Sequence, residues 1–196
     1  MVVSCPELHR TGLNAADSRT AHRHERVVAA VTGFCPDVEL VEPGVCAFGT
    51  RGPARYFGGE TALAAAVTAA VADLGVESRA GVADGLFAAL LAARDGTTVP
   101  PGGTARFLAA QPVSVLPDQD LATLLNRLGL GTLGAFAALP ARDVASRFGD
   151  TGEYAHRLAR GLDSSPLATR PPPADLSVAR EFDPPEPRAE PAVFAA

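Results

Sequence analysis

The segment with the clearest potential chemistry is a glycine turn between two short apolar stretches. Gly129 and Gly131 flank Leu130, and Thr132 follows before a second apolar stretch begins. Glycines adopt backbone conformations that other residues avoid, so the amides of such a turn can point outward beside the start of the next helix. Outward amides stabilise a phosphate without reading the base sequence. These four residues, with Arg127 beside them, are therefore predicted to bind nucleic acid.

The same turn also fits an ordinary pair of helices, in which Gly129 ends the first helix and Thr132 caps the second. The turn alone favours neither interpretation. The charged residues around it nearly cancel, because Arg127, Arg142 and Arg147 are accompanied by Asp118, Asp120, Asp143 and Asp150. Nucleic-acid binding through this segment alone is predicted to be weak and sensitive to salt.

The first part of the chain, residues 1–111, has the pattern of an α+β layer. Its apolar residues follow helical spacing in some segments and form short β-branched runs in others. The elements expected are a helix over 14–31, strands over 38–41 and 45–48, a helix over 59–74, a strand over 76–82 and a helix through Leu91 that Asp84 caps.

The second part has no strand signal. Apolar stripes at helical spacing run from Leu121 to about Leu162, which predicts a small all-helical unit over residues 112–163. Residues 164–196 are rich in proline and poor in apolar side chains, so we expect a linker with a strand stub at 177–182.

Composition excludes several classes of protein. The 196 residues are 47% hydrophobic, enough for a real core, and the net charge of −5 argues against nucleic-acid binding over the whole surface. All 17 basic residues are arginine, which excludes lysine nucleophiles, Schiff-base lysines and P-loop lysines. No secretory or membrane-spanning segment is evident, so we expect a soluble, cytoplasmic protein with no membrane partner.

No metal or cofactor site is expected. Cys5, Cys35 and Cys46 lack the spacing of a zinc site. His22 and His24 lie two residues apart, so on a helix they point to different sides, and we interpret both as part of a solvated face.

Several stretches together resemble the Y-family translesion DNA polymerases, over most of residues 5–185. The order and spacing of the thumb are carried by VPPGGTARFLAAQPVSVLP, LLNRLGLGTLGAFAALPARDVASRFGDTG and AHRLARGLD, and the palm by AGVADGLFAALLAAR and by CPEL followed by VELVEPG. Within the family, RGPARYFGGE and EFDPP are most similar to the non-catalytic ImuB group.

The resemblance implies a fold in three pieces: a partial ferredoxin-like palm with the end of the fingers in residues 1–111, a helix-hairpin-helix thumb in 112–163, and the start of a little finger in 164–196. Both ends are expected to be truncated. The thumb's first glycine hairpin falls at residues 117–119, where no glycine occurs. Tyr56, which follows the palm's catalytic strand, is interpreted as a packing residue.

The resemblance also implies a lost active site. The family holds two metal ions with carboxylates from two strands, and alignment places Gly44 and Val45 at the Asp-Glu pair of the second strand. A slip of register could bring Glu42 or Glu39 near, but the Pro-Gly turn makes this unexpected. The first metal-binding strand is expected to precede Met1. We therefore predict that the chain is not an enzyme.

The resulting hypothesis is a non-catalytic protein of DNA repair and SOS mutagenesis. It would bind damaged or primer-template DNA weakly and act as an adaptor that brings an error-prone polymerase and an accessory protein to the lesion. One alternative is an error-prone Y-family polymerase whose catalytic N-terminus is missing. Another is a remnant that folds poorly and has no function.

Overall fold

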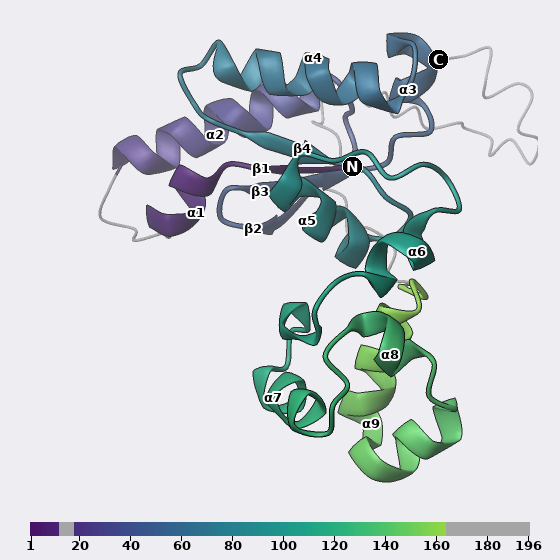
Figure 1. The fold of residues 1–196 in the computed structure, drawn as a ribbon. Helices are drawn as coiled ribbons and strands as arrows, with labels where there is room; N and C mark the ends of the chain where they lie inside the picture. The colour runs from purple at the N-terminus through teal and green to yellow at the C-terminus, as the bar shows by residue number, and fades with distance from the viewer. Residues whose placement is uncertain (12–17, 164–196) are drawn as a thin grey trace, which may run out of the picture.

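The computed structural model describes residues 1–11 and 18–163, which form two stacked parts (Figure 1). The upper part, called here the sheet half, is a small β-sheet with its helices. The lower part, called the helical half, contains helices from residue 104 onward. The linker and strand stub expected in residues 164–196, and the first four residues of the helix expected over 14–31, lie outside the described residues.

The sheet has four antiparallel strands in the order β2-β3-β1-β4. The strands are β1 (Val2–Ser4), β2 (Val38–Glu42), β3 (Val45–Phe48) and β4 (Arg79–Gly81). Helices α1 (Pro6–Thr11) and α2 (Ser18–Thr32) connect β1 to β2, and α3 (Pro53–Phe57) and α4 (Glu60–Ala72) connect β3 to β4. This is the βαββαβ order of a ferredoxin-like unit.

The ferredoxin-like unit is complete, so the prediction of a partial one is wrong. The strand that sequence analysis missed is β1, which lies in the centre of the sheet between β3 and β4. Three residues are too few to show strand periodicity, and Val2 and Val3 are both buried, so no apolar–polar alternation marks the strand. The two predicted strands over 38–48 are confirmed, and the strand expected over 76–82 is shorter, at 79–81.

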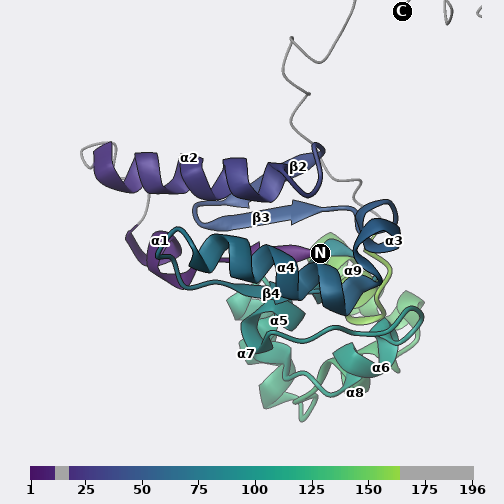
Figure 2. The same cartoon turned by 90° about the horizontal axis from the view of Figure 1, so that it is seen from above.

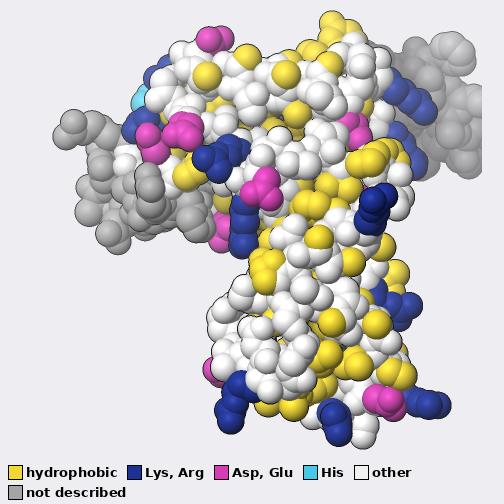
Figure 3. Space-filling view, viewed as in Figure 1, with side chains coloured by type: hydrophobic (Ala, Val, Ile, Leu, Met, Phe, Trp, Pro, Cys, Tyr) yellow, Lys and Arg dark blue, Asp and Glu magenta, His cyan; other side chains and the backbone are white. Residues whose placement is uncertain are grey.

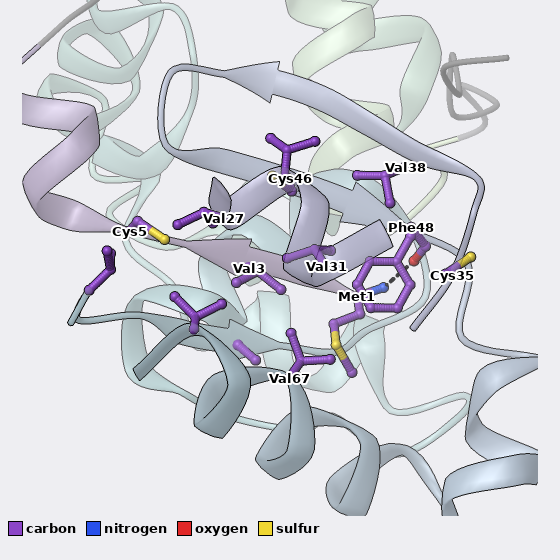
Figure 4. Close-up of a cluster of buried hydrophobic side chains, with 14 of the residues drawn as sticks. Met1, Val3, Cys5, Val27, Val31, Cys35, Val38, Cys46, Phe48 and Val67 are labelled. Atoms are coloured by element: carbon purple, nitrogen blue, oxygen red, sulfur yellow. Dashed lines mark hydrogen bonds between the residues drawn. The ribbon is translucent and has the colours of Figure 1, made fainter. Parts of the chain in front are cut away.

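Helices cover both faces of the sheet. Figure 2 shows α2 and α4 along one face, where Val31 and Val67 pack with Val3 and Phe48 in the core drawn in Figure 4. Helix α5 (Leu86–Asp95) covers the other face, and its Ala89 and Ala93 contact the strands. Gly81 permits this approach, because a β-carbon there would lie 2.0 Å from the backbone nitrogen of Ala93.

The expected cap of α5 is wrong. Gly85, and not Asp84, precedes the first turn, and the amide of Phe87 donates to Oδ2 of Asp163 at 2.9 Å. The Asp84 carboxylate instead accepts from the amide of Gly102 at 2.8 Å. A cap supplied from 76 residues away leaves no local pattern in the sequence.

The helical half consists of α6 (Thr104–Ala109), α7 (Gln119–Arg127), α8 (Leu133–Ala137) and α9 (Ala141–Ala159), with a 3₁₀ turn at Val113–Val115. Leu125, Leu133 and Phe136 are fully buried at its centre. Phe87 and Leu91 of α5 belong to this core as well, while other α5 residues face the sheet. The two cores thus share one helix. Among residues 1–11 and 18–163, no helix combines the length and apolar character needed to cross a bilayer.

Candidate nucleic-acid interface

The glycine turn joins α7 to α8 at the lower end of the molecule (Figure 1). Gly129 has a φ of 81°, the left-handed conformation in which glycine is favoured. The amide of Gly129 donates to the carbonyl of Asn126 at 3.0 Å, and the amide of Leu130 donates to that of Leu125 at 2.9 Å. Both amides therefore complete the end of α7.

The second half of the turn is fixed by backbone contacts to a distant segment. The amide of Leu133 donates to the carbonyl of Gln111 at 2.8 Å, and the amide of Val113 donates to the carbonyl of Gly131 at 3.1 Å. Thr132 caps α8, since its Oγ1 accepts from the amide of Ala135 at 3.2 Å. The capping roles that sequence analysis considered for Gly129 and Thr132 are both present.

The predicted site residues differ in what they can offer to a phosphate. The amides of Gly131 and Thr132 have no hydrogen-bond acceptor among the described residues, and both residues are exposed. The amides of Gly129 and Leu130 are engaged, and the Leu130 side chain packs against the helical core. Gly131 does not use a left-handed backbone, contrary to expectation. The amides that can bind a phosphate are therefore those of Gly131 and Thr132.

Arginines flank this amide pair from two helices. Arg127 lies exposed in the last turn of α7, as the sequence indicates. Arg147 of α9 lines a cavity of about 560 Å³ together with Leu128 and Leu130, which places it beside the turn despite the separation in sequence. Sequence analysis did not predict this cavity, because it forms only when α9 packs across the turn.

Acidic groups offset these arginines, as expected. Figure 3 shows basic and acidic side chains next to one another at the lower end of the helical half. Arg142 pairs with Asp143, with 3.4 Å between Nε and Oδ1. At the position expected for the first glycine hairpin, Asp118 caps α7 instead, and its Oδ1 accepts from the amide of Leu121 at 2.8 Å. A carboxylate therefore occupies the start of that helix, where a phosphate would otherwise be favoured.

The second predicted locus is the strand end at Gly44 and Val45. β1 lies directly beside it: the amide of Cys5 donates to the carbonyl of Gly44 at 2.8 Å, and Ser4 is paired with Val45. Sequence analysis expected the first metal-binding strand to precede Met1, but a strand of this chain occupies the place next to β3. Ser4 ends this strand, and Cys5 follows it.

The register at this end also differs from the prediction. Leu40 pairs with Cys46 and Glu42 pairs with Val45, so an irregularity lies between Leu40 and Glu42. Sequence analysis considered such a slip unexpected, and it is present. Glu42 consequently lines a cavity of about 280 Å³ together with Ser4 of β1 and Arg94 of α5.

The thiols near this end are unreactive by environment. Burial, and secondarily the charge of Glu7, raises the pKa of Cys5 to about 11. Burial, and secondarily Cys5, raises the pKa of Cys46 to about 12. A nucleophilic or metal-binding cysteine needs a lowered pKa, so both thiols act as small core residues.

Within the part of the chain that the structure describes, no three His, Cys, Asp or Glu side chains gather closely enough to hold a metal ion. His22 is exposed and His24 is buried, so the two do point to different sides of α2. The interpretation of both as solvated is wrong for His24. Tyr56 was also misassigned: it is 85% exposed and does not pack as a core residue.

Comparison with known proteins connects this geometry to a family. The chain is 34% identical over 117 residues to DNA polymerase IV of Dehalococcoides mccartyi, an alignment covering 56% of this chain and 30% of that protein. It is 36% identical over 125 residues to protein ImuB of Caulobacter vibrioides, covering 62% of this chain and 27% of ImuB. The chain thus spans less than a third of the length of these relatives.

Solved structures share the fold. A DinB family error-prone DNA polymerase from Sulfolobus solfataricus superposes with a TM-score of 0.64 at 17% sequence identity, over 76% of this chain and 47% of the polymerase. DinB from the same organism gives a TM-score of 0.61 at 18% identity. No protein-family profile matches the chain.

Proposed function

We propose, from the membership of this chain in the DinB- and UmuC-like Y family of DNA polymerases, that it acts in translesion synthesis as a non-catalytic DNA-binding protein. In this role the sheet half is a palm and the helical half a helix-hairpin-helix thumb. The thumb binds the DNA backbone weakly, and the protein serves as an adaptor for an error-prone polymerase and an accessory protein.

The observation that carries the DNA-binding part is the pair of exposed amides at Gly131 and Thr132, which lack an acceptor among the described residues. Backbone amides positioned by a rigid turn suit a phosphate oxygen. The contacts to Gln111 and Val113 hold this turn in place, so little ordering is needed on binding. Arg127 and Arg147 add positive charge on either side.

The residues at the strand ends support the non-catalytic part. Two-metal nucleotidyl transfer needs several carboxylates around a pair of cations. Here Ser4 and Cys5 lie beside Gly44 and Val45, where the family resemblance places carboxylates. Glu42 shares its cavity with Arg94, and a guanidinium disfavours a divalent cation nearby.

An error-prone polymerase is the alternative, and one observation favours it: relatives named DNA polymerase IV match this chain at 34% identity over 117 residues. Primer extension with Mg²⁺ or Mn²⁺ distinguishes the two. The adaptor proposal expects no extended product from the chain, and extension that Glu42→Gln abolishes would establish the polymerase.

The DNA-binding proposal is tested by fluorescence anisotropy with labelled primer-template DNA across a salt series. The informative variant is Gly131→Asp, because a β-carbon at 131 meets its nearest atom, Asn126 Oδ1, only at 3.7 Å and the backbone is unstrained. The added carboxylate lies next to the amide pair, so binding should weaken about tenfold or more, the size of one lost charge-assisted hydrogen bond.

Ala65→Asp on the exposed face of α4 is the control, since it adds the same charge in the sheet half, away from the amides and from Arg127. This control should weaken binding by less than about threefold at moderate salt, where exposed charges are screened. Equal losses in both variants would mean that only overall charge matters, and the hairpin site would be abandoned. A folded chain that does not bind at low salt would direct the role to protein–protein contacts.

A further inference from the structure

Tyr56 stands at the end of α3 with most of its ring in solvent. It is 85% exposed, the largest exposed fraction among the large apolar side chains that the structure describes. Arg51 and Arg55 nearby are exposed as well. Figure 3 shows basic side chains projecting from the edge of the molecule at α3. The three residues Arg51, Arg55 and Tyr56 are called here the α3 knob.

The helix that carries Arg55 and Tyr56 is fixed by Phe57 and by both of its ends. Phe57, the next residue, packs on Phe34 with 5.2 Å between ring centroids and meets Tyr56 edge to face at 4.9 Å. Pro53 begins the helix and Gly58, with a φ of 85°, ends it. A rigid, exposed aromatic ring costs little entropy to immobilise, which is the property of a binding residue.

Within residues 1–11 and 18–163, no carboxylate neutralises the charge of the α3 knob. Neither Arg51 nor Arg55 forms an ion pair with a carboxylate of the described residues. Glu60, the acidic residue that follows α3, accepts instead from Oγ1 of Thr50 at 2.6 Å. Two cations and an open aromatic face therefore point outward together.

We propose that the α3 knob binds single-stranded nucleic acid, with a base stacked on Tyr56 and phosphates on Arg51 and Arg55. Single strands are bound in this way because every base has a π face and every linkage a charge. A protein partner fits less well, because a stable interface needs an apolar centre and the exposed neighbours of Tyr56 are arginines and glycines: Arg51, Gly52, Arg55 and Gly58.

This site is separate from the hairpin. Figure 1 shows α3 beside α4, on the opposite side of the sheet from the helical half. The inference adds a single-strand contact to the proposed DNA-binding role but does not require the hairpin to bind. Its experiment must therefore report on Tyr56 alone.

Tyrosine fluorescence can report on Tyr56 alone, because the chain has no tryptophan and only two tyrosines, Tyr56 and Tyr154. In Tyr154→Phe, Tyr56 is the sole emitter, and in Tyr56→Phe, Tyr154 is. Titration with an oligothymidylate of about 20 nucleotides should quench Tyr56 emission to saturation, whereas Tyr154 emission should show only the absorption of the added DNA. Equal changes in both variants would overturn the proposal.

Further experiments distinguish base stacking on Tyr56 from phosphate binding by the arginines. Arg51→Ala with Arg55→Ala, in the Tyr154→Phe background, should lower the salt slope of binding by about 1.4, or 0.7 for each phosphate contact on a single strand. An abasic oligonucleotide should leave Tyr56 unquenched, and quenching by it would overturn the stacking. Quenching by polyglutamate equal to that by DNA would overturn the nucleic-acid assignment in favour of an acidic protein.

The hairpin variant tests whether the two sites bind independently. Gly131→Asp should leave the quenching of Tyr56 by oligothymidylate unchanged, because the two sites lie on opposite sides of the sheet. Retained quenching together with lost primer-template binding would support both sites separately. Retained primer-template binding without quenching of Tyr56 would overturn the α3 knob alone.

Discussion

The strand ends at Ser4 and Val45 and the turn at Gly131 and Thr132 differ in the atoms that would do chemistry. At the strand ends, metal binding depends on side chains, and the side chains present are a hydroxyl, a thiol, apolar groups and the carboxylate of Glu42, which shares its cavity with Arg94. At the turn, phosphate binding depends on backbone amides, which any sequence that folds into the same turn presents. A few substitutions erase the first kind of site, whereas the second persists as long as the fold does.

The packing around both sites is intact. The sheet half keeps a complete βαββαβ order and buried strands, and the helical half keeps a core centred on Leu125, Leu133 and Phe136. The proposed loss of catalytic side chains would therefore not have required loss of packing. We therefore expect variants that alter packing to affect both halves, whereas variants of the less buried polar residues Ser4 and Glu42 at the strand ends should affect neither the fold nor DNA binding.

The largest expected effect concerns whether the halves are independent. Phe136→Ala should lower the free energy of unfolding by about 3–5 kcal/mol, because Phe136 is fully buried. Since α5 contributes to both cores, the sheet half should lose stability too. Urea denaturation of the single-tyrosine variants follows each half, with Tyr56 in the sheet half and Tyr154 in the helical half. Two separate midpoints would contradict the coupling.

The next effect tests the thiols at the strand ends. Unfolding lowers the pKa of Cys5 from about 11 and of Cys46 from about 12 to the ordinary value of 9.0. A raised folded pKa stabilises the protein below pH 9 and loses that contribution as pH rises toward 11–12. At pH 10 the loss should be about 1.4 kcal/mol for each thiol.

The measurement is urea denaturation at pH 8 to 10.5, a range free of lysine titration because the chain has no lysine. The control is Cys5→Ala with Cys46→Ala, which should flatten the pH dependence even if it lowers stability overall. An unchanged slope in this variant would show that the thiols are already ionised or exposed in the folded state.

The two glycines of the turn should respond differently to alanine. Gly129→Ala should cost about 1–2 kcal/mol, because alanine is strained at a φ of 81°. Gly131→Ala should change stability by less than about 0.5 kcal/mol, since its backbone is ordinary and its surroundings are open. Thermal unfolding of the matched pair measures both. Equal costs would mean that the turn adopts another conformation.

The smallest effect compares two helix caps. Asp118→Ala removes a cap within the helical half, and Asp163→Ala removes one that connects the helical half to α5; each should cost about 1 kcal/mol. Only Asp163→Ala should also increase hydrogen exchange at the start of α5, at Phe87. Exchange at Phe87 that is unchanged in Asp163→Ala would show that the cap does not hold the halves together.

Sequence reasoning succeeded where the signal was local. The helix over 18–32, the strands over 38–48 and the helix ending near Gly75 follow from spacing and turn residues, as do the conformation of Gly129 and the cap at Thr132. Their determinants lie within a few residues along the chain. The absence of an Asp-Glu pair at positions 44 and 45 is likewise written in the sequence itself.

Sequence reasoning failed where contacts with distant segments determine a residue's role. Asp84 has the residue type of a cap, but Asp163 takes the position at α5. Tyr56 resembles a core residue by type, but Phe57 turns inward in its place. Glu42 reaches the end of β3 because of a register irregularity that only the paired strand reveals.

By itself, then, the sequence determined the local elements, the turn at residues 128–133 and the presence of Gly44 and Val45 at one strand end. Only the tertiary structure placed β1 at the centre of the sheet, brought Arg147 beside the turn and left the amides of Gly131 and Thr132 without an acceptor in the part of the chain that the structure describes. The reason is physical: backbone preference acts over a few residues, whereas strand pairing and hydrogen-bond satisfaction depend on which remote segments come into contact.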